Sequence, residues 1–275
     1  MKRIINWCSG GVGNRLRPLA ACHSFAKQTG RTLAACWQPT TRCMTYFHDL
    51  YENEIELLEF KDIANLESVS IYSEKEYIVH DAKLNGNQTL FNLMTKYGHK
   101  SLANTGQINH DTADNIIVYD NNFFAGADAQ LAHSFIKQLI PLVEIQHKIG
   151  NFLKETALDK SWIGVHARGT DFESRGISAE TYVKKMNSYP QKKFFVCSDS
   201  LEYEQYVTSK IPNSIFNKKQ AYVGKSHAGE WDNNVMTPKE SVQDSLVDMY
   251  LLAKTDFLIY REDSTYAEII KILSS

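Results

Sequence analysis

The sequence predicts a mixed α/β protein with two domains, each built on a mostly parallel sheet. Three observations support this prediction. The chain opens with a strand, a glycine-rich turn, a helix and a second strand; from Lys160 onward strand and helix patterns alternate; and a long helical pattern separates these two stretches. Strands that alternate with helices form parallel sheets covered by helices on both faces. A chain of 275 residues can supply two such cores.

The first domain is expected at residues 1–150. KRIINW (residues 2–7) predicts a buried strand, CSGGVGN (residues 8–14) a tight turn, and residues 15–30 a helix that tolerates Pro18 in its first turn and ends at Gly30. The remaining expected elements are strands at 31–37, 68–73, 76–81 and 115–120, a helix at 89–98, and a helical pattern at 125–154 that Pro141 kinks or divides.

The second domain is expected at residues 151–275, where the alternation is regular. Its last long helix, TPKESVQDSLVDMYLLAKT (residues 237–255), opens with a capping-box pattern of Thr237, Pro238 and Glu240. The other expected elements are strands at 161–167, 192–198, 213–217 and 256–260, and helices at 178–188, 200–210 and 264–273.

The turn GGVGNR (residues 10–15) joins a strand to a helix, as phosphate-binding loops do. Gly11 and Gly13 match the start of a dinucleotide-binding fingerprint, but Leu16 occupies its third glycine position and the next strand brings no ribose-binding acid. Asn14 and Arg15, with Arg17 beside them, indicate an anionic or hydroxyl-rich ligand at the helix start. The alternative is a tight turn with exposed arginines.

Polar clusters follow three strands of the second domain: VHARGTD (residues 165–171), CSDS (197–200) and YREDST (260–265). In an open parallel sheet the ligand crevice lies beyond the carboxyl ends of the strands, so these clusters are expected to share one site. Each also has a structural alternative, because serine, aspartate and threonine commonly cap helices and a lone histidine is often a core residue. The residues concerned are His166, Arg168, Ser198, Asp199, Asp263, Ser264 and Thr265, with Asp244 and Asp248 sharing one face of the last long helix.

Composition excludes several classes of function. The formal charge of −2 gives no reason to expect a nucleic-acid partner, and no stretch is apolar and long enough to be a signal peptide or a membrane span, although contact with a membrane surface stays open. Five scattered cysteines indicate reduced thiols in a cytoplasmic protein. Because the chain has neither DxD nor HExxH, no metal site is expected, and arginine and backbone N–H groups would have to neutralise a phosphate ligand.

At the glycine turn and the three strand-end clusters, the chain resembles a known family, the α1,6-fucosyltransferases of the bacterial nodulation type and the animal core type. IGVHARGTD (residues 163–171) resembles the family's arginine-containing strand-end motif, and FFVCSDS (194–200) resembles its second motif. DSLVDMYLLAKTDFLIYREDSTYAEII (244–270) is similar to the third motif, and residues 10–37 are similar to the N-terminal loop, helix and strand of the nodulation enzymes. The resemblance covers most of residues 160–273 and this N-terminal segment.

The resemblance implies a GT-B-like fold, in which two Rossmann-like α/β domains face each other across a cleft. The N-terminal domain would lie on the acceptor side, and the C-terminal domain would hold a nucleotide sugar, GDP-fucose. It further implies an inverting, metal-independent transfer that uses no cofactor besides the donor substrate. By position, Arg168 would contact the donor diphosphate, His166 and Asp199 would line the donor pocket, Asp248 would contact guanine or ribose, and Ser264 would contact phosphate.

The chain departs from the family pattern at two of these positions. Gly169 stands where the family has a second arginine, and Asp263 stands where it has a second small hydroxyl residue. Arg175, Arg261 and Lys225 are candidates to replace the missing positive charge. Arg168 is the expected catalytic cation, since a fixed guanidinium stabilises charge that develops on a leaving phosphate. Glu173 and Asp171 are candidates for the base that activates the acceptor hydroxyl.

The function predicted from the sequence is fucosyl transfer from GDP-fucose to a glycan acceptor, lipid-linked acceptors included, in surface-polysaccharide or oligosaccharide biosynthesis. A first alternative is an enzyme of the same fold that uses another GDP-sugar, because Gly169 alters the central motif. Two alternatives come from other classes: an NAD-dependent oxidoreductase, suggested by GGVGN, and a non-catalytic protein that binds sugar nucleotides.

Overall fold

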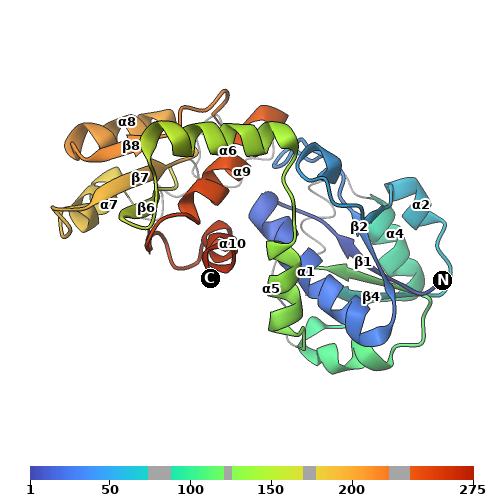
Figure 1. The fold of residues 1–275 in the computed structure, drawn as a ribbon. Coiled ribbons are helices and arrows are strands. Elements are labelled where there is room, and N and C mark those ends of the chain that lie inside the picture. The colour runs from blue at the N-terminus through green and yellow to red at the C-terminus, as the bar shows by residue number, and fades with distance from the viewer. Residues whose placement is uncertain (74–87, 121–125, 170–177, 223–235) are drawn as a thin grey trace. The chain divides into compact units, whose positions relative to one another are not determined.

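The structure, a computed structural model, describes residues 1–73, 88–120, 126–169, 178–222 and 236–275 (Figure 1). The chain divides into two compact units: Met1–Thr40, Tyr46–His48 and Glu52–Ile140 form the first, and Thr41–Thr45, Asp49–Tyr51 and Pro141–Ser275 form the second. Within the described residues, each unit is built on one parallel sheet whose strands alternate with helices. The predicted α/β class is confirmed.

Among the described residues, the first unit has a five-stranded sheet in the order β3-β2-β1-β5-β4, and its neighbouring strands run in parallel. Isoleucines of the central strands, Ile4, Ile5 and Ile117, are fully buried between the helices on the two faces. The elements are β1 (Arg3–Trp7), α1 (Val12–Thr29), β2 (Thr32–Cys36), the 3₁₀ helix η1 (Phe47–Asp49), β3 (Glu56–Leu57), α2 (Phe60–Ala64), β4 (Val69–Ser73), α4 (Gln88–Tyr97), the 3₁₀ helix η2 (Leu102–His110), β5 (Asn115–Tyr119) and α5 (Ala129–Lys137).

Two local predictions for this unit need comment. Helix α1 begins at Val12, so Pro18 lies inside the helix and not in its first turn; Gly30, with a left-handed φ of 66°, ends the helix as expected. The helical pattern at 125–154 is divided at Pro141, which lies between α5 and α6. The strand predicted at 76–81 lies outside the described residues.

The second unit has a four-stranded sheet in the order β8-β7-β6-β9, again with parallel pairings. Val165 on the central strand β6 pairs with Val196 on one side and Ile259 on the other, and all three are buried. The elements are α6 (Val143–Thr156), β6 (Trp162–His166), α7 (Ala179–Met186), β7 (Lys193–Cys197), α8 (Leu201–Lys210), β8 (Ser214–Phe216), α9 (Lys239–Leu252), β9 (Leu258–Ile259) and α10 (Thr265–Ser274).

The capping box predicted at the start of α9 is wrong. The N-cap residue is Pro238, and no side chain caps the helix. Thr237 is instead held through its backbone, which donates to the Thr41 carbonyl at 2.6 Å and accepts from the Met44 amide at 3.1 Å. These long-range bonds hold the backbone of Thr237 outside the helix, so the N-cap lies one residue later than the local pattern predicts.

In the parts of the chain that the structure describes, no helix combines the length and the apolar character needed to cross a bilayer.

Candidate functional site

The polar clusters predicted from the sequence leave the second unit's sheet at one edge. Strands β6, β7 and β9 are neighbours and run in parallel, so the segments that follow them emerge together. Strand β8 runs the same way beside β7 and adds a fourth polar segment, from Asn217 to Tyr222, which sequence reasoning treated only as a loop. This carboxyl edge is the candidate site.

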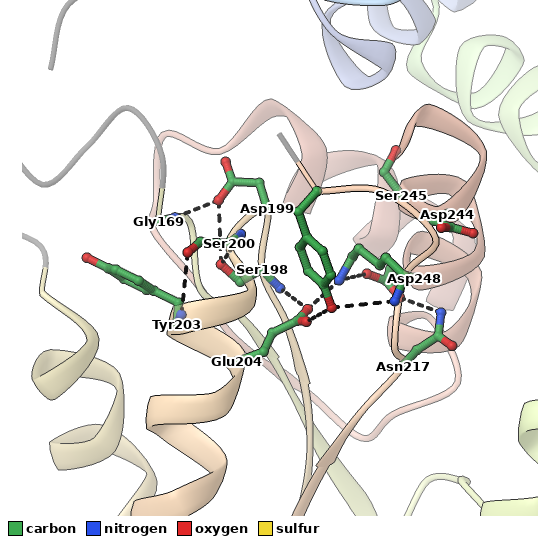
Figure 2. Close-up of polar contacts among 12 residues, drawn as sticks. Gly169, Ser198, Asp199, Ser200, Tyr203, Glu204, Asn217, Asp244, Ser245 and Asp248 are labelled. Carbon is green, nitrogen blue, oxygen red and sulfur yellow. Dashed lines mark hydrogen bonds and ion pairs between the residues drawn. The ribbon is translucent and has the colours of Figure 1, made fainter. Parts of the chain in front are cut away.

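Arg168 and Asp199 meet at the ends of β6 and β7. The Asp199 Oδ1 atom accepts a hydrogen bond of 2.7 Å from the Gly169 amide (Figure 2). Its Oδ2 atom lies 3.8 Å from Nε of Arg168. The Arg168 side chain is 38% exposed, so a solute can reach its guanidinium. An anion at this edge would find a cation already oriented by a neighbouring carboxylate.

Gly169 is closed to any larger residue. A Cβ atom added there would lie 2.9 Å from Cβ of Ser200 and 2.9 Å from ring atoms of Tyr203, which is shorter than real Cβ contacts. Ser200 and Tyr203 are both buried at the start of α8. The glycine is therefore required by the close approach of this helix to the end of β6.

His166, at the end of β6, is held by the segment that follows β9. Its Nδ1 atom lies 3.3 Å from Oγ of Ser264, and its ring packs on Tyr266 with centroids 4.7 Å apart. Ser264 Oγ also accepts from the Ala267 amide at 3.2 Å, so this hydroxyl ties His166 to the start of α10. Burial, helped by the Arg168 charge, lowers the pKa of His166 to about 4. His166 is thus a neutral hydrogen-bonding group at neutral pH.

The remaining residues after β9 have separate roles. Ser264 is the N-cap of α10, so the capping interpretation and the site interpretation both apply to it. Thr265 is the first residue of α10 and is half-buried. Asp263 is exposed and pairs with Arg261, whose side chain is 19% exposed.

Below the edge lies a buried cluster of charges made by Glu204, Lys219 and Asp248. Lys219 Nζ lies 2.9 Å from Oδ2 of Asp248 and also pairs with Oε1 of Glu204. The three side chains are at most 5% exposed. Burial raises the pKa of Glu204 to about 7 and also raises the pKa of Asp248. Burial by itself would lower the pKa of Lys219, but the charges of Asp248, Cys197 and Glu204 outweigh it and raise that pKa.

Sequence reasoning missed Glu204 and Lys219, since one lies in an ordinary helix pattern and the other in a polar loop. Asp248 was expected to reach a ligand directly. In the structure its carboxylate is paired with Lys219 and accepts a hydrogen bond of 3.2 Å from the side-chain amide of Asn217 (Figure 2). Asp244, one turn earlier on α9, is paired separately, with Lys148 at 2.8 Å and with the Gln220 amide at 2.6 Å.

The glycine turn of the first unit differs from the prediction at its arginines. Gly10 has a φ of 69°, and Gly11 is the N-cap of α1, which has no side-chain cap and no acid in its first turn. Gly13 is buried and Asn14 half-buried in that turn. This uncapped helix end suits an anion.

Arg15 is fully buried, so it is not one of the exposed arginines that the alternative interpretation of the turn expected. It donates to the carbonyls of Gly10 and Gln38, each at 2.9 Å, and to Thr40 Oγ1 at 2.8 Å, and its guanidinium lies 5.2 Å from the centre of the Trp37 ring. Arg15 therefore fixes the glycine turn to the segment that follows β2.

The two candidate bases, Asp171 and Glu173, lie outside the described residues, as do Arg175 and Lys225. Within the ranges that the structure describes, histidine, cysteine, aspartate and glutamate side chains form no group of three or more that could hold a metal ion.

Comparison with known proteins gives consistent matches. The family described as nodulation protein Z (NodZ) matches residues 2–274. Nodulation protein Z of Bradyrhizobium diazoefficiens is 23% identical over 278 aligned residues, which cover 90% of this chain and 72% of that protein.

Solved structures agree on the fold. The fucosyltransferase NodZ from Bradyrhizobium has a TM-score of 0.68 at 21% identity, and the match covers 99% of this chain and 92% of that one. NodZ α1,6-fucosyltransferase co-crystallised with GDP gives the same TM-score of 0.68 at 20% identity, with coverage of 99% and 92%. POFUT1 in complex with GDP-fucose has a TM-score of 0.58 at 13% identity, with coverage of 99% and 93%. The GT-B-like fold expected from the sequence is confirmed.

Proposed function

The chain belongs to the nodulation protein Z family, and from this premise we propose that it transfers a fucosyl group from GDP-fucose to a hydroxyl of a glycan acceptor. The family match over residues 2–274 carries the proposal, because it includes every strand end of the candidate site. NodZ α1,6-fucosyltransferase, a protein of similar fold, has been co-crystallised with GDP and soaked with GDP-fucose. The reachable guanidinium of Arg168 at the sheet's carboxyl edge fits such an anionic donor.

Fucosyl transfer requires a cation close to the leaving diphosphate. In an inverting transfer, the acceptor oxygen forms a bond to the sugar's anomeric carbon while the bond from that carbon to the phosphate oxygen breaks. The electron pair of the broken bond goes to the phosphate, and a base takes the acceptor's proton. Arg168 stabilises the charge that develops on the phosphate. Asp171 and Glu173 stay the proposed candidates for the base.

A second cation is proposed to be Arg261. The closed position of Gly169 leaves no room for another arginine there. Arg168 and Arg261 lie just beyond the paired residues Val165 and Ile259 of neighbouring strands. Two guanidinium groups suit a diphosphate better than one.

The other donor-binding residues are part of the same proposal. In the second unit, His166, Ser198, Asp263, Ser264 and Thr265 are proposed to supply further polar groups for the donor. In the first unit, the uncapped turn of Gly11, Gly13 and Asn14 is proposed as an anion-binding element in its own right. We propose a reaction without a metal ion or a resident cofactor, in the cytoplasm, with a surface-polysaccharide or oligosaccharide precursor as acceptor. The five cysteines are all buried and none forms a disulfide, which is consistent with a reducing compartment.

Calorimetry with GDP, UDP and NAD in the presence of EDTA tests the donor class. Binding of GDP alone is the expected result, whereas binding of NAD without GDP would sink the proposal in favour of an oxidoreductase. Turnover of GDP-fucose in EDTA then separates an enzyme from a non-catalytic binding protein and shows whether a metal is needed.

Another GDP-sugar is the second candidate donor, because Gly169 departs from the motif that the resemblance implies. Turnover of GDP-mannose and GDP-fucose at equal concentrations decides between them. Preference for GDP-fucose is the expected result.

A further inference from the structure

The buried Glu204–Lys219–Asp248 cluster contains more hydrogen-bonded groups than a simple ion pair. Each carboxylate oxygen has a partner: Glu204 Oε1 accepts from Lys219 and from the Ser198 amide at 2.8 Å, and Glu204 Oε2 accepts from the Tyr222 hydroxyl at 2.6 Å. The Asp248 oxygens accept from Lys219 and Asn217. One lysine thus joins two carboxylates inside a fully hydrogen-bonded network.

Such a network is an inefficient way to stabilise a core. Taking three charged groups out of water carries a desolvation penalty that their mutual attraction repays only with good geometry, and apolar residues of similar volume are often equally stabilising. The raised pKa values of Glu204 and Asp248 express this penalty. What the network does supply is a fixed position for the groups bonded to it.

Those groups lead directly to the candidate site. Glu204 holds the Ser198 amide, and Ser198 Oγ accepts from the Ser200 amide at 3.1 Å, which fixes the turn that follows β7. That turn carries Asp199, which accepts from the Gly169 amide at 2.7 Å (Figure 2). The Asp199 carboxylate also lies 3.8 Å from Arg168 Nε. A continuous series of contacts therefore runs from Lys219 through Glu204, Ser198 and Asp199 to Arg168.

We propose that Lys219 is a positioning residue for the transfer reaction: by bridging Glu204 and Asp248 it holds the turn after β7 so that Asp199 orients Arg168 toward the leaving diphosphate. This inference rests on the proposed function for its catalytic consequence. Lys219 itself is buried and has no role as a direct ligand of the donor. Its effect passes through the turn.

The decisive variant is Lys219→Met, which removes the charge but keeps a side chain of similar length. Its matched control is Lys192→Met, because Lys192 precedes the same strand β7 and pairs with Asp256 at 3.5 Å on the surface. Hydrogen exchange is expected to speed up at the Ser198 and Gly169 amides of the Lys219 variant by about tenfold or more, and to stay unchanged in the control.

Steady-state kinetics below the melting temperature of each variant give the second readout. In Lys219→Met, kcat should fall about 10- to 100-fold while KM for GDP-fucose changes by less than about threefold, since the guanidinium's orientation matters most when charge develops on the phosphate. A purely structural lysine would lower the melting temperature and leave kcat of the folded protein intact. A folded Lys219→Met protein with unchanged exchange and kcat within about twofold of wild type overturns the proposal.

A second variant covers the case in which Lys219→Met does not fold. Glu204→Ala leaves Lys219 and Asp248 as a charge-balanced pair and removes the acceptor of the Ser198 amide, along with the acceptor of the Tyr222 hydroxyl. It should give the same exchange and kcat changes. If wild-type protein neither binds GDP nor turns over GDP-fucose, the proposed function fails, and the exchange data alone then decide whether Lys219 holds the turn.

Discussion

Replacing Gly169 with alanine tests whether this position is a glycine because of packing. The added Cβ would stand 2.9 Å from Ser200 Cβ and from ring atoms of Tyr203, where ordinary contacts are 3.4–4 Å. Gly169 has no left-handed φ, so the backbone itself imposes no penalty. Neither neighbour can move freely, because Ser200 is the N-cap of α8 and Tyr203 is 5% exposed. Overpacking of this kind costs about 1–3 kcal/mol of unfolding free energy.

Thermal and urea denaturation measure this cost. At about 2–4 °C per kcal/mol, Gly169→Ala should lower Tm by about 2–12 °C. The control is Gly150→Ala in α6, where an added Cβ meets nothing within 4 Å and the exposed helix should gain about 0.5–1 kcal/mol.

A double-mutant cycle identifies the clashing partner. In a Tyr203→Ala background, the cost of Gly169→Ala should shrink by about 1 kcal/mol or more, since the ring is gone. An unchanged Tm for Gly169→Ala would refute the packing argument, and an equal cost in both backgrounds would assign the clash to Ser200 alone. By the same argument Gly169→Arg, which restores the arginine of the resembling family, should destabilise the protein further and bring no gain in turnover.

Three further predictions concern the site and the turn of the first unit. Arg168→Ala should lower turnover of GDP-fucose by about 10²–10³-fold in a folded protein, and near-normal turnover would make the residue structural. Burial lowers the pKa of His166 from 6.5 to about 4, so its imidazole takes up a proton in the unfolded chain at a higher pH than in the folded protein. The unfolding free energy should therefore fall by about 3 kcal/mol as the pH is lowered from about 6.5 to 4. Burial raises the pKa of Glu204 to about 7, so protonation of Glu204 stabilises the folded state over the same pH range. The quantity to measure is therefore the difference in unfolding free energy between wild type and His166→Asn as a function of pH. A difference that does not change with pH contradicts the lowered pKa of His166. Arg15→Met should lower the unfolding free energy by about 2–5 kcal/mol in urea titrations, because three buried or half-buried acceptors lose a charged donor, and unchanged stability would show that the turn does not need the arginine.

Much of the fold was predictable because its signals are local. The order of strands and helices, the end of α1 at Gly30 and the break at Pro141 depend on side-chain periodicity and on residues with special backbone preferences within a few positions. The start of α9 was not predictable in this way, since backbone bonds from Thr237 to Thr41 and Met44 override the capping pattern.

The sequence by itself determined that polar residues follow several parallel strands, and parallel strands necessarily deliver those residues to one edge. It therefore indicated Arg168, Asp199 and Ser264 as neighbours in a site. Only the tertiary structure decided which charges are available to a ligand. The Arg15 guanidinium already donates to carbonyls around it, and Asp248 is paired with Lys219, which lies in another segment of the chain. Burial and pairing depend on contacts between residues far apart in the chain, and a local pattern carries no information about them.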